Sequence, residues 1–204
     1  KSSGRHRYYY KSQVELYLND LFDLANSWVR YKREISAQFY CSNSAIFQAR
    51  LSKLQDQLSE RSDLNKILPL IVAVSGEIGN NSFDHNLGNW PDVPGIFFGY
   101  NIHEGTVILA DRGLGVLTTL KRVRPDLKND SEALRVAFTE IVSGRAPESR
   151  GNGLKFVRKI VAQYPVSLVF RTGDAELRIE KNNGEIRITE NPEPFRGCLA
   201  LIKF

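Results

Sequence analysis

The sequence is poor in the residues that build metal and disulfide frameworks. Only two cysteines occur in 204 residues, Cys41 and Cys198, and neither belongs to a C-x-x-C or Cys/His cluster. This spacing argues against a disulfide or zinc scaffold and suits a reducing compartment, so we expect a cytoplasmic location. The densest apolar run, residues 67–74, is interrupted by Pro69 and is too short to cross a bilayer. There is no methionine at all, and we therefore expect a fragment or a processed product with possible upstream domains.

The composition is that of an ordinary globular protein. The apolar fraction is 42% and the charged fraction is 25%, which is enough apolar surface to bury a core. The net charge of +5 fits either a nucleic-acid surface or anionic ligands. Because the basic residues are dispersed along the sequence, nucleic-acid binding is only a distant option.

The first third of the chain indicates helices. Apolar residues recur at helical spacing over residues 14–33 and again over 45–58, and these two helices can form a hairpin. We therefore divide the chain into residues 1–62, a tail with a helical hairpin, and residues 63–204, a separate domain. The hairpin is either a dimerisation or docking element or a segment that packs on its own domain.

The rest of the chain indicates an α+β fold. A helix is expected from Asp63, its N-cap, to about residue 85, and others over 131–142 and 154–163. Strands are expected, in sequence order, over residues 95–101, 106–110, 166–171, 175–180, 185–189 and 198–204. Together these helices and strands predict a two-layer sandwich, in which a mixed or largely antiparallel sheet is covered on one face by helices. An N-terminal helical extension precedes it.

Three short strings carry the chemistry. The first, E-I-G-N-N-S-F-D-H, places Glu77, Asn81 and His85 at i, i+4 and i+8 of the expected helix, so the three share one face. The second, D-R-G-L-G, starts with Asp111 at the end of an apolar strand and runs into a tight loop. The third, G-N-G-L, starts at Gly151 and leads into a helix whose first amides favour anions.

These three strings, in this order, resemble the GHKL superfamily of ATP-binding domains, whose fold is the Bergerat type. The likeness covers residues 64–204 and implies that ATP and Mg²⁺ are the ligands. By the resemblance, Asp111 accepts the exocyclic amine of adenine, Asn81 binds Mg²⁺, and Glu77 orients water or a phosphoryl acceptor. The remaining nucleotide contacts that the resemblance and the local chemistry imply are His85, Gly113, Gly115, Arg150, Gly151, Asn152, Gly153, Leu154 and Lys155.

The sequence departs from the family pattern at three places. Lys155 replaces the last glycine of G-x-G-L-G, and Cys198 replaces a threonine whose hydroxyl supports adenine through water. No H-x-x-x-P phosphoacceptor string is present, which argues against autophosphorylation on histidine.

Two functions follow as hypotheses. In the first, the chain binds Mg-ATP and acts in signalling, by hydrolysis or by phosphotransfer to a separate partner protein, as anti-sigma-factor serine kinases do. In the second, it is a nucleotide-gated interaction module with little catalysis. A protein partner or a homodimer through the N-terminal helices is expected in either case.

Overall fold

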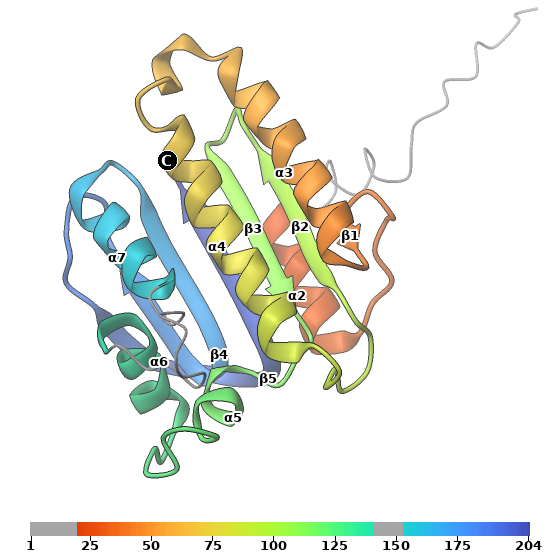
Figure 1. Cartoon of the computed structure of the whole chain (residues 1–204), viewed down its shortest axis with the longest axis vertical. Coiled ribbons are helices and arrows are strands. Elements are labelled where there is room, and N and C mark those ends of the chain that lie inside the picture. Colours follow the sequence, from red (N-terminus) through yellow and green to blue (C-terminus); the bar gives the residue numbers. More distant parts are fainter. Residues whose placement is uncertain (1–19, 141–152) are drawn as a thin grey trace, which may run out of the picture.

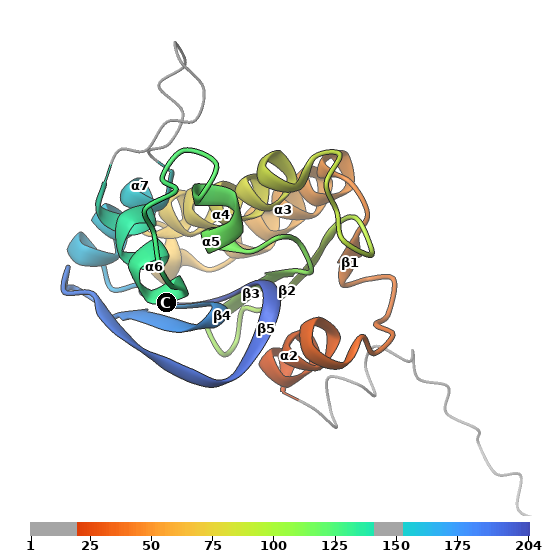
Figure 2. The same cartoon turned by 90° about the horizontal axis from the view of Figure 1, so that it is seen from below.

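The chain folds as one antiparallel sheet with helices on both faces (Figures 1 and 2). The computed structural model describes residues 20–140 and 153–204. The helices, in chain order, are α2 (Leu21–Tyr31), α3 (Ser44–Ser59), the short 3-10 turn η1 (Ser62–Leu64), α4 (Leu68–Asn86), α5 (Val116–Leu120), α6 (Asp130–Thr139) and α7 (Gly153–Gln163). The strands are β1 (Tyr40–Cys41), β2 (Ile96–Asn101), β3 (Thr106–Asp111), β4 (Ser167–Ile179) and β5 (Arg187–Lys203).

The strands form a sheet in the order β1-β2-β3-β5-β4, and every neighbouring pair is antiparallel. The central strand β3 is paired along its full length, from Thr106 opposite Lys203 to Asp111 opposite Cys198 on β5. The α+β class expected from the sequence is confirmed. The register places the end of β3 beside the middle of the β4–β5 hairpin, which positions Asp111.

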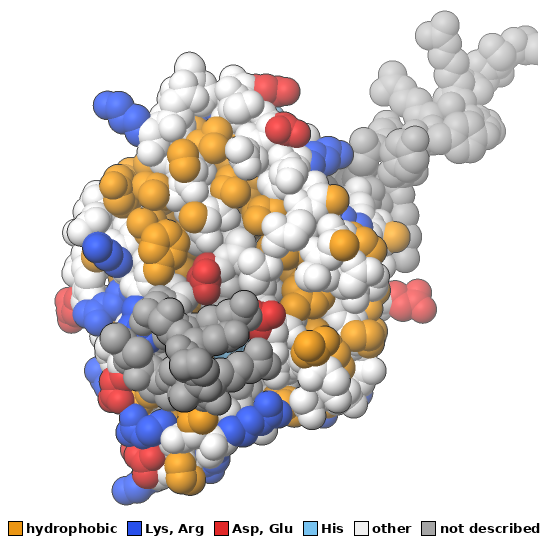
Figure 3. Space-filling model, viewed as in Figure 1, with side chains coloured by type: hydrophobic (Ala, Val, Ile, Leu, Met, Phe, Trp, Pro, Cys, Tyr) orange, Lys and Arg blue, Asp and Glu red, His pale blue; other side chains and the backbone are white. Residues whose placement is uncertain are grey.

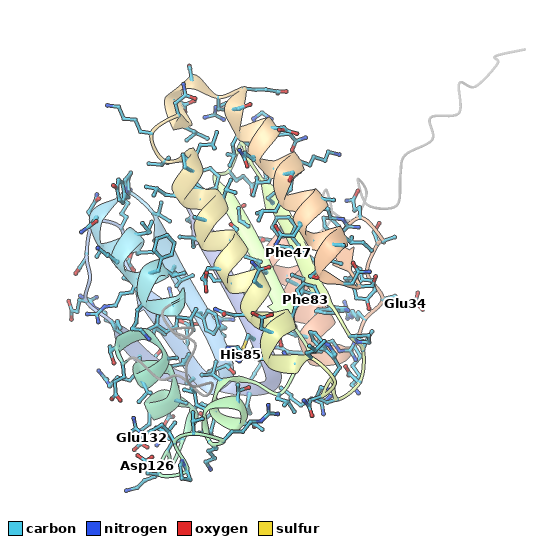
Figure 4. The ribbon with its side chains drawn as sticks, in the orientation of Figure 1. Glu34, Phe47, Phe83, His85, Asp126 and Glu132 are labelled. Carbon is cyan, nitrogen blue, oxygen red and sulfur yellow. The ribbon has the colours of Figure 1, made fainter. Side chains whose placement is uncertain are left out.

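One face of the sheet carries the main core under α3, α4, α6 and α7. Helix α3 packs closely on α4 because α4 has glycine at the contact: a Cβ added to Gly79 would lie 2.2 Å from the Phe47 ring. Figure 4 shows Phe47 between the two helices. Helix α3 therefore shares one hydrophobic core with α4 and the sheet, although it precedes the boundary that we placed after residue 62.

The opposite face of the sheet is covered by α2 (Figure 2). Strand alternation separates the two cores: Val107 and Leu109 belong to the first, whereas Ile108 and Ala110 pack with Trp28 of α2. The expected hairpin of the two N-terminal helices is thus wrong, because their apolar faces are buried on opposite sides of the sheet. Residues 14–19 of the expected first helix lie outside the described residues.

Three other local expectations need correction. The four short strands expected after residue 165 are two long ones, which continue through register shifts at Gly173, a residue with φ of 53°. Asp63 does not cap α4, because its carboxylate pairs with Arg61 and α4 begins five residues later, with Pro69 in its first turn. Strand β1 and helix α5 were not expected at all.

Strand β4 is an edge of the sheet, and it carries a group of paired charges. The buried carboxylate of Glu176 accepts hydrogen bonds from Arg171 and Arg178 of the same strand. The Arg171 guanidinium also lies over the ring of Phe22 in α2, 5.0 Å from its centroid. These contacts join the sheet edge to the helix on the second face.

Candidate functional site

The structure brings the sequence strings together around one pocket. It lies between α4, the end of β3 and the helices α5, α6 and α7, on the helix-rich face of Figure 1. Its lining residues are Ile78, Asn81, Ser82, His85, Asn86, Asp111, Gly115, Val116, Thr119, Leu120, Ala137, Leu154, Phe170 and Cys198. Apolar walls with a few convergent polar groups are the usual construction of a small-molecule site.

Asp111 is the buried acid of this pocket, with 2% of its surface exposed. The Ser82 hydroxyl donates to its Oδ2 at 2.7 Å, and the Gly113 N–H donates to its Oδ1 at 2.8 Å. Burial raises the pKa of Asp111, and these hydrogen bonds, with others from Cys198, oppose the rise. A carboxylate has about four acceptor sites, so a donor on a ligand would share or replace one of these hydrogen bonds at Asp111.

Hydrogen bonds of the Asn86 side chain hold the loop after Asp111 against α4. The Asn86 side chain accepts from the Leu114 N–H at 2.8 Å and donates to the Ser82 carbonyl at 2.8 Å. A Cβ added to Gly113 would lie 2.2 Å from the Asn86 Nδ2 atom. Gly113 therefore makes room for the amide of Asn86, a function that the D-x-G-x-G string alone does not reveal.

The other side of the loop is held by a hydrogen bond to Thr172 of β4. Gly115 has φ of 80° and precedes α5 as its N-cap, a conformation that favours glycine. The next N–H, that of Val116, donates to the buried hydroxyl of Thr172 at 3.2 Å, and this hydroxyl donates to the Gly197 carbonyl at 2.8 Å. Thr172 is paired with Cys198 across β4 and β5. Strand β4, which pairs with β5 at Cys198, thus supplies the Thr172 hydroxyl that holds the loop after Asp111.

The three residues on the shared face of α4 have different surroundings. Asn81 and His85 line the pocket, and Figure 4 shows His85 near the end of α4 that faces α5. Glu77 lies against the start of α7: a Cβ added to Gly153 would be 1.7 Å from the Glu77 Oε1 atom. Burial and, second, the charge of Asp84 raise the pKa of Glu77. The first and third strings thus meet through Glu77 and Gly153.

The third string is described only in part. Leu154 lines the pocket, and the Lys155 ammonium donates to the carbonyl of Glu140 at the end of α6. Burial lowers the pKa of Lys155. Arg150, Gly151 and Asn152 lie outside the described residues.

The sequence did not predict several residues of the site, among them three that make its hydrogen bonds: Ser82, Asn86 and Thr172. Ser82 and Asn86 are one helical turn apart on α4, next to the predicted Asn81 and His85, and their spacing was a usable signal. Thr172 could not be found this way, because its proximity to Gly115 depends on the register of β4 against β5.

Neither metal clusters nor membrane spans are found in residues 20–140 and 153–204. Within these ranges no group of three or more His, Cys, Asp or Glu side chains is placed to hold a metal ion. Their helices are also too short or too polar to cross a membrane. Figure 3 shows lysines and arginines scattered around the rim of the helix-rich face, with no continuous basic stripe there.

Comparison with known proteins gives a distant likeness of fold. No family model and no curated protein sequence matches the chain. A solved structure similar to it is the 43K ATPase domain of Thermus thermophilus gyrase B in complex with an aminocoumarin, with 20% identity and a TM-score of 0.38. The match covers 64% of this chain and 32% of the gyrase chain. The chain therefore spans about a third of that protein's length.

Proposed function

We propose that this chain is a GHKL-type domain that binds Mg-ATP in the pocket at the end of β3. The observation that carries the proposal is the buried carboxylate of Asp111, which lies in an apolar pocket with Asn81 and His85 on its α4 wall. A buried acid is costly unless it is paired or neutralised, and an acid whose pKa is raised by burial in a pocket is a candidate functional residue.

The inner part of the pocket fits a purine base. Ile78, Val116 and Phe170 provide apolar walls, and Asp111 offers acceptor oxygens among them. An exocyclic amine donates to such an acceptor, whereas a carbonyl at the same place would face the carboxylate oxygen and be repelled. The exocyclic amine of adenine is such a donor; guanine also carries amine and N–H donors, so the preference for adenine rests on the resemblance to the GHKL superfamily.

The outer part of the pocket fits a magnesium triphosphate. Mg²⁺ keeps several waters and takes few protein oxygens, so a single amide oxygen from Asn81 is a sufficient protein ligand. Bound Mg-ATP would supply the γ-phosphoryl group. His85 and Lys155, with Arg150, Gly151 and Asn152 of the third string, would then contact the phosphates. Glu77 would orient and deprotonate the attacking water or hydroxyl.

The finer function that we propose is phosphotransfer to a separate partner protein or ATP hydrolysis, in signalling. The absence of an H-x-x-x-P string favours an acceptor on another chain. Incubation with labelled ATP and candidate partners tests this, and label on a histidine of this chain itself would contradict it.

Calorimetric titration with ATP and Mg²⁺ tests binding. We expect binding by the wild-type chain, loss of binding in Asp111→Asn, and no change in Asp56→Asn, a matched substitution at an exposed site on α3. If wild type and Asp111→Asn both fail to bind, or bind equally, the nucleotide site is not here.

A second candidate function is a nucleotide-gated interaction module with little catalysis. The observation that favours it is the position of Glu77, which lies against Gly153 and is not among the pocket-lining residues. Glu77→Gln separates the two functions. Loss of about 100-fold or more in turnover with unchanged ATP affinity supports catalysis by Glu77. Negligible turnover in the wild-type chain, with ATP-dependent dimerisation or partner binding, supports the module.

A further inference from the structure

A group of charges lies on the opposite side of the sheet from the pocket. The carboxylate of Asp92 is surrounded by three cations: Arg112 at 2.5 Å, Lys32 at 3.4 Å and Arg196 at 3.5 Å. We call these four residues the basic cluster. They come from four separate segments, namely the loop before β2, the end of β3, the C-cap of α2 and the middle of β5.

The cluster is held by specific contacts. Arg112 is only 11% exposed at its side chain, and its guanidinium lies over the Trp28 ring of α2, 5.5 Å from the centroid. Lys32 ends α2 in the left-handed conformation with φ of 55°, where glycine is the favoured residue. A lysine in this backbone conformation costs conformational energy that glycine would avoid, which indicates that the charge of Lys32 has a function.

The positive charge of the cluster exceeds its negative charge by two, since one carboxylate faces three cations. Burial alone would raise the pKa of Asp92, but hydrogen bonds from the Val93 N–H, Arg112 and Lys32 hold it below its ordinary value. Asp92 is thus ionised at neutral pH and is the acid that these three ion pairs share. The two outer cations remain accessible, with side chains 64% exposed at Lys32 and 50% exposed at Arg196.

We propose that the basic cluster is a docking point for an acidic, carboxylate-rich segment of a partner protein. The carboxylate of Asp92 shows which ligand chemistry the three cations already accept, and the excess charge leaves capacity for a second carboxylate. Tyr31, 63% exposed, precedes Lys32 and adds an exposed aromatic ring. Tyrosine and arginine together are typical of protein interfaces, which favours a protein partner over a free phosphate or a lipid surface.

The docking surface is independent of the nucleotide pocket. Asp111, the last residue of β3, lines the pocket, whereas the guanidinium of the next residue, Arg112, lies over the Trp28 ring of α2, so the two side chains lie on opposite sides of the sheet. Loss of acidic-peptide binding and loss of ATP binding are consequently separate results, and failure of one proposal does not decide the other.

The test uses a fluorescein-labelled peptide of ten glutamates and one tyrosine, measured by fluorescence anisotropy against the full chain. We expect Lys32→Ala/Arg196→Ala to weaken binding at least tenfold. The matched control is Lys53→Ala/Lys66→Ala, which removes the same charge from exposed positions on the helix-rich side and should bind like wild type. Both double variants should keep the wild-type melting temperature and ATP affinity. Equal weakening in the two double variants would mean that only net charge matters and would overturn the proposal.

Asp92→Asn gives the sharper result, because it removes the internal competitor for the cations. If the cluster is a docking point, the peptide binds several-fold tighter to this variant, and the gain shrinks as salt rises. If the cluster only fastens α2 to the sheet, binding is unchanged or weaker, which contradicts the proposal. Tripolyphosphate and phosphatidylserine vesicles are the remaining probes, and preference for either over the peptide in the same buffer would also overturn it.

Discussion

Gly113 provides the most quantitative test of how the pocket is built. A methyl group added at residue 113 would lie 2.2 Å from Nδ2 and 2.3 Å from Oδ1 of Asn86, well inside contact distance. Because Gly113 and Asn86 are both buried, the amide has to move for Gly113→Ala to fold. We therefore expect this single methyl group to be strongly destabilising.

The size of the effect follows from the bonds that Asn86 makes. Moving the amide breaks its 2.8 Å hydrogen bond to the Ser82 carbonyl and leaves the Leu114 N–H without its 2.8 Å acceptor. A lost hydrogen bond costs about 1 kcal/mol and an unpaired buried donor about 1–3 kcal/mol, so the total is about 2–4 kcal/mol. For a chain of this size, that lowers the melting temperature by about 5–15 °C.

The assay is thermal and denaturant unfolding of four proteins that form a double-mutant cycle. Gly113→Ala is measured in the wild-type chain and again in Asn86→Ala, where the obstructing amide is absent. We expect the cost of the added methyl to fall below about 1 kcal/mol in the second background, since the two changes share one contact. Calorimetry on Gly113→Ala should also show weaker ATP binding, because the Gly113 N–H donates to Asp111.

Gly76→Ala is the matched control. It adds the same methyl inside α4, where the nearest atom is the flexible end of Leu51 at 3.2 Å, and alanine is favoured over glycine in a helix by about 1 kcal/mol. Its stability should be unchanged or higher. An equal cost of Gly113→Ala with and without the Asn86 amide would refute the reasoning, as would a neutral Gly113→Ala.

Three further predictions concern buried groups. Burial raises the pKa of Asp111 in the folded chain, so its contribution to stability is present at low pH and is lost as pH rises above the ordinary aspartate range. In unfolding experiments at increasing pH, Asp111→Asn should flatten this decline. Gly79→Ala should destabilise by about 1–3 kcal/mol in denaturant unfolding, because its methyl meets the Phe47 ring at 2.2 Å. If Glu77 is a catalytic base, its raised pKa moves the acidic limb of the kcat/KM profile to a higher pH than an ordinary glutamate would give. Asp84→Asn removes a charge that raises this pKa, so it should move the limb to lower pH. A limb that does not move would exclude Glu77 as the titrating group.

The sequence was informative wherever local pattern decides structure. The apolar spacing of α3, α4 and α7 and the apolar runs of β2 and β3 predicted these elements within a few residues. Their apolar residues recur at the period of the element that they form, and the partner surface does not alter that period.

Local pattern failed where tertiary contacts choose between alternatives. The amphipathic face of α2 shows that a partner surface exists, but it does not show that this surface is the second face of the sheet. Likewise, Gly173 and the prolines of the β5 segment are turn signals in the sequence, yet long-range pairing carries both strands through them.

The residues of the candidate site also divide into those that local pattern predicts and those that tertiary contacts determine. Asn81, His85, Asp111, Gly115 and Leu154 were named from the strings, and the structure places all five on the pocket wall. The contacts that hold the loop, from Asn86 and Thr172, depend on approaches between distant segments. Sequence spacing contains no information on such approaches unless the strand register is known.

The charged group on β4 has a consequence for the behaviour of the protein at high concentration. An edge strand of 13 residues presents unpaired backbone groups that another chain can use as a template for strand addition. Glu176 with Arg171 and Arg178 places three charges along this edge, and a second strand that docked there would have to desolvate them. Neutral substitutions at these positions would remove a barrier to fibrous self-association as well as three ion-pair partners.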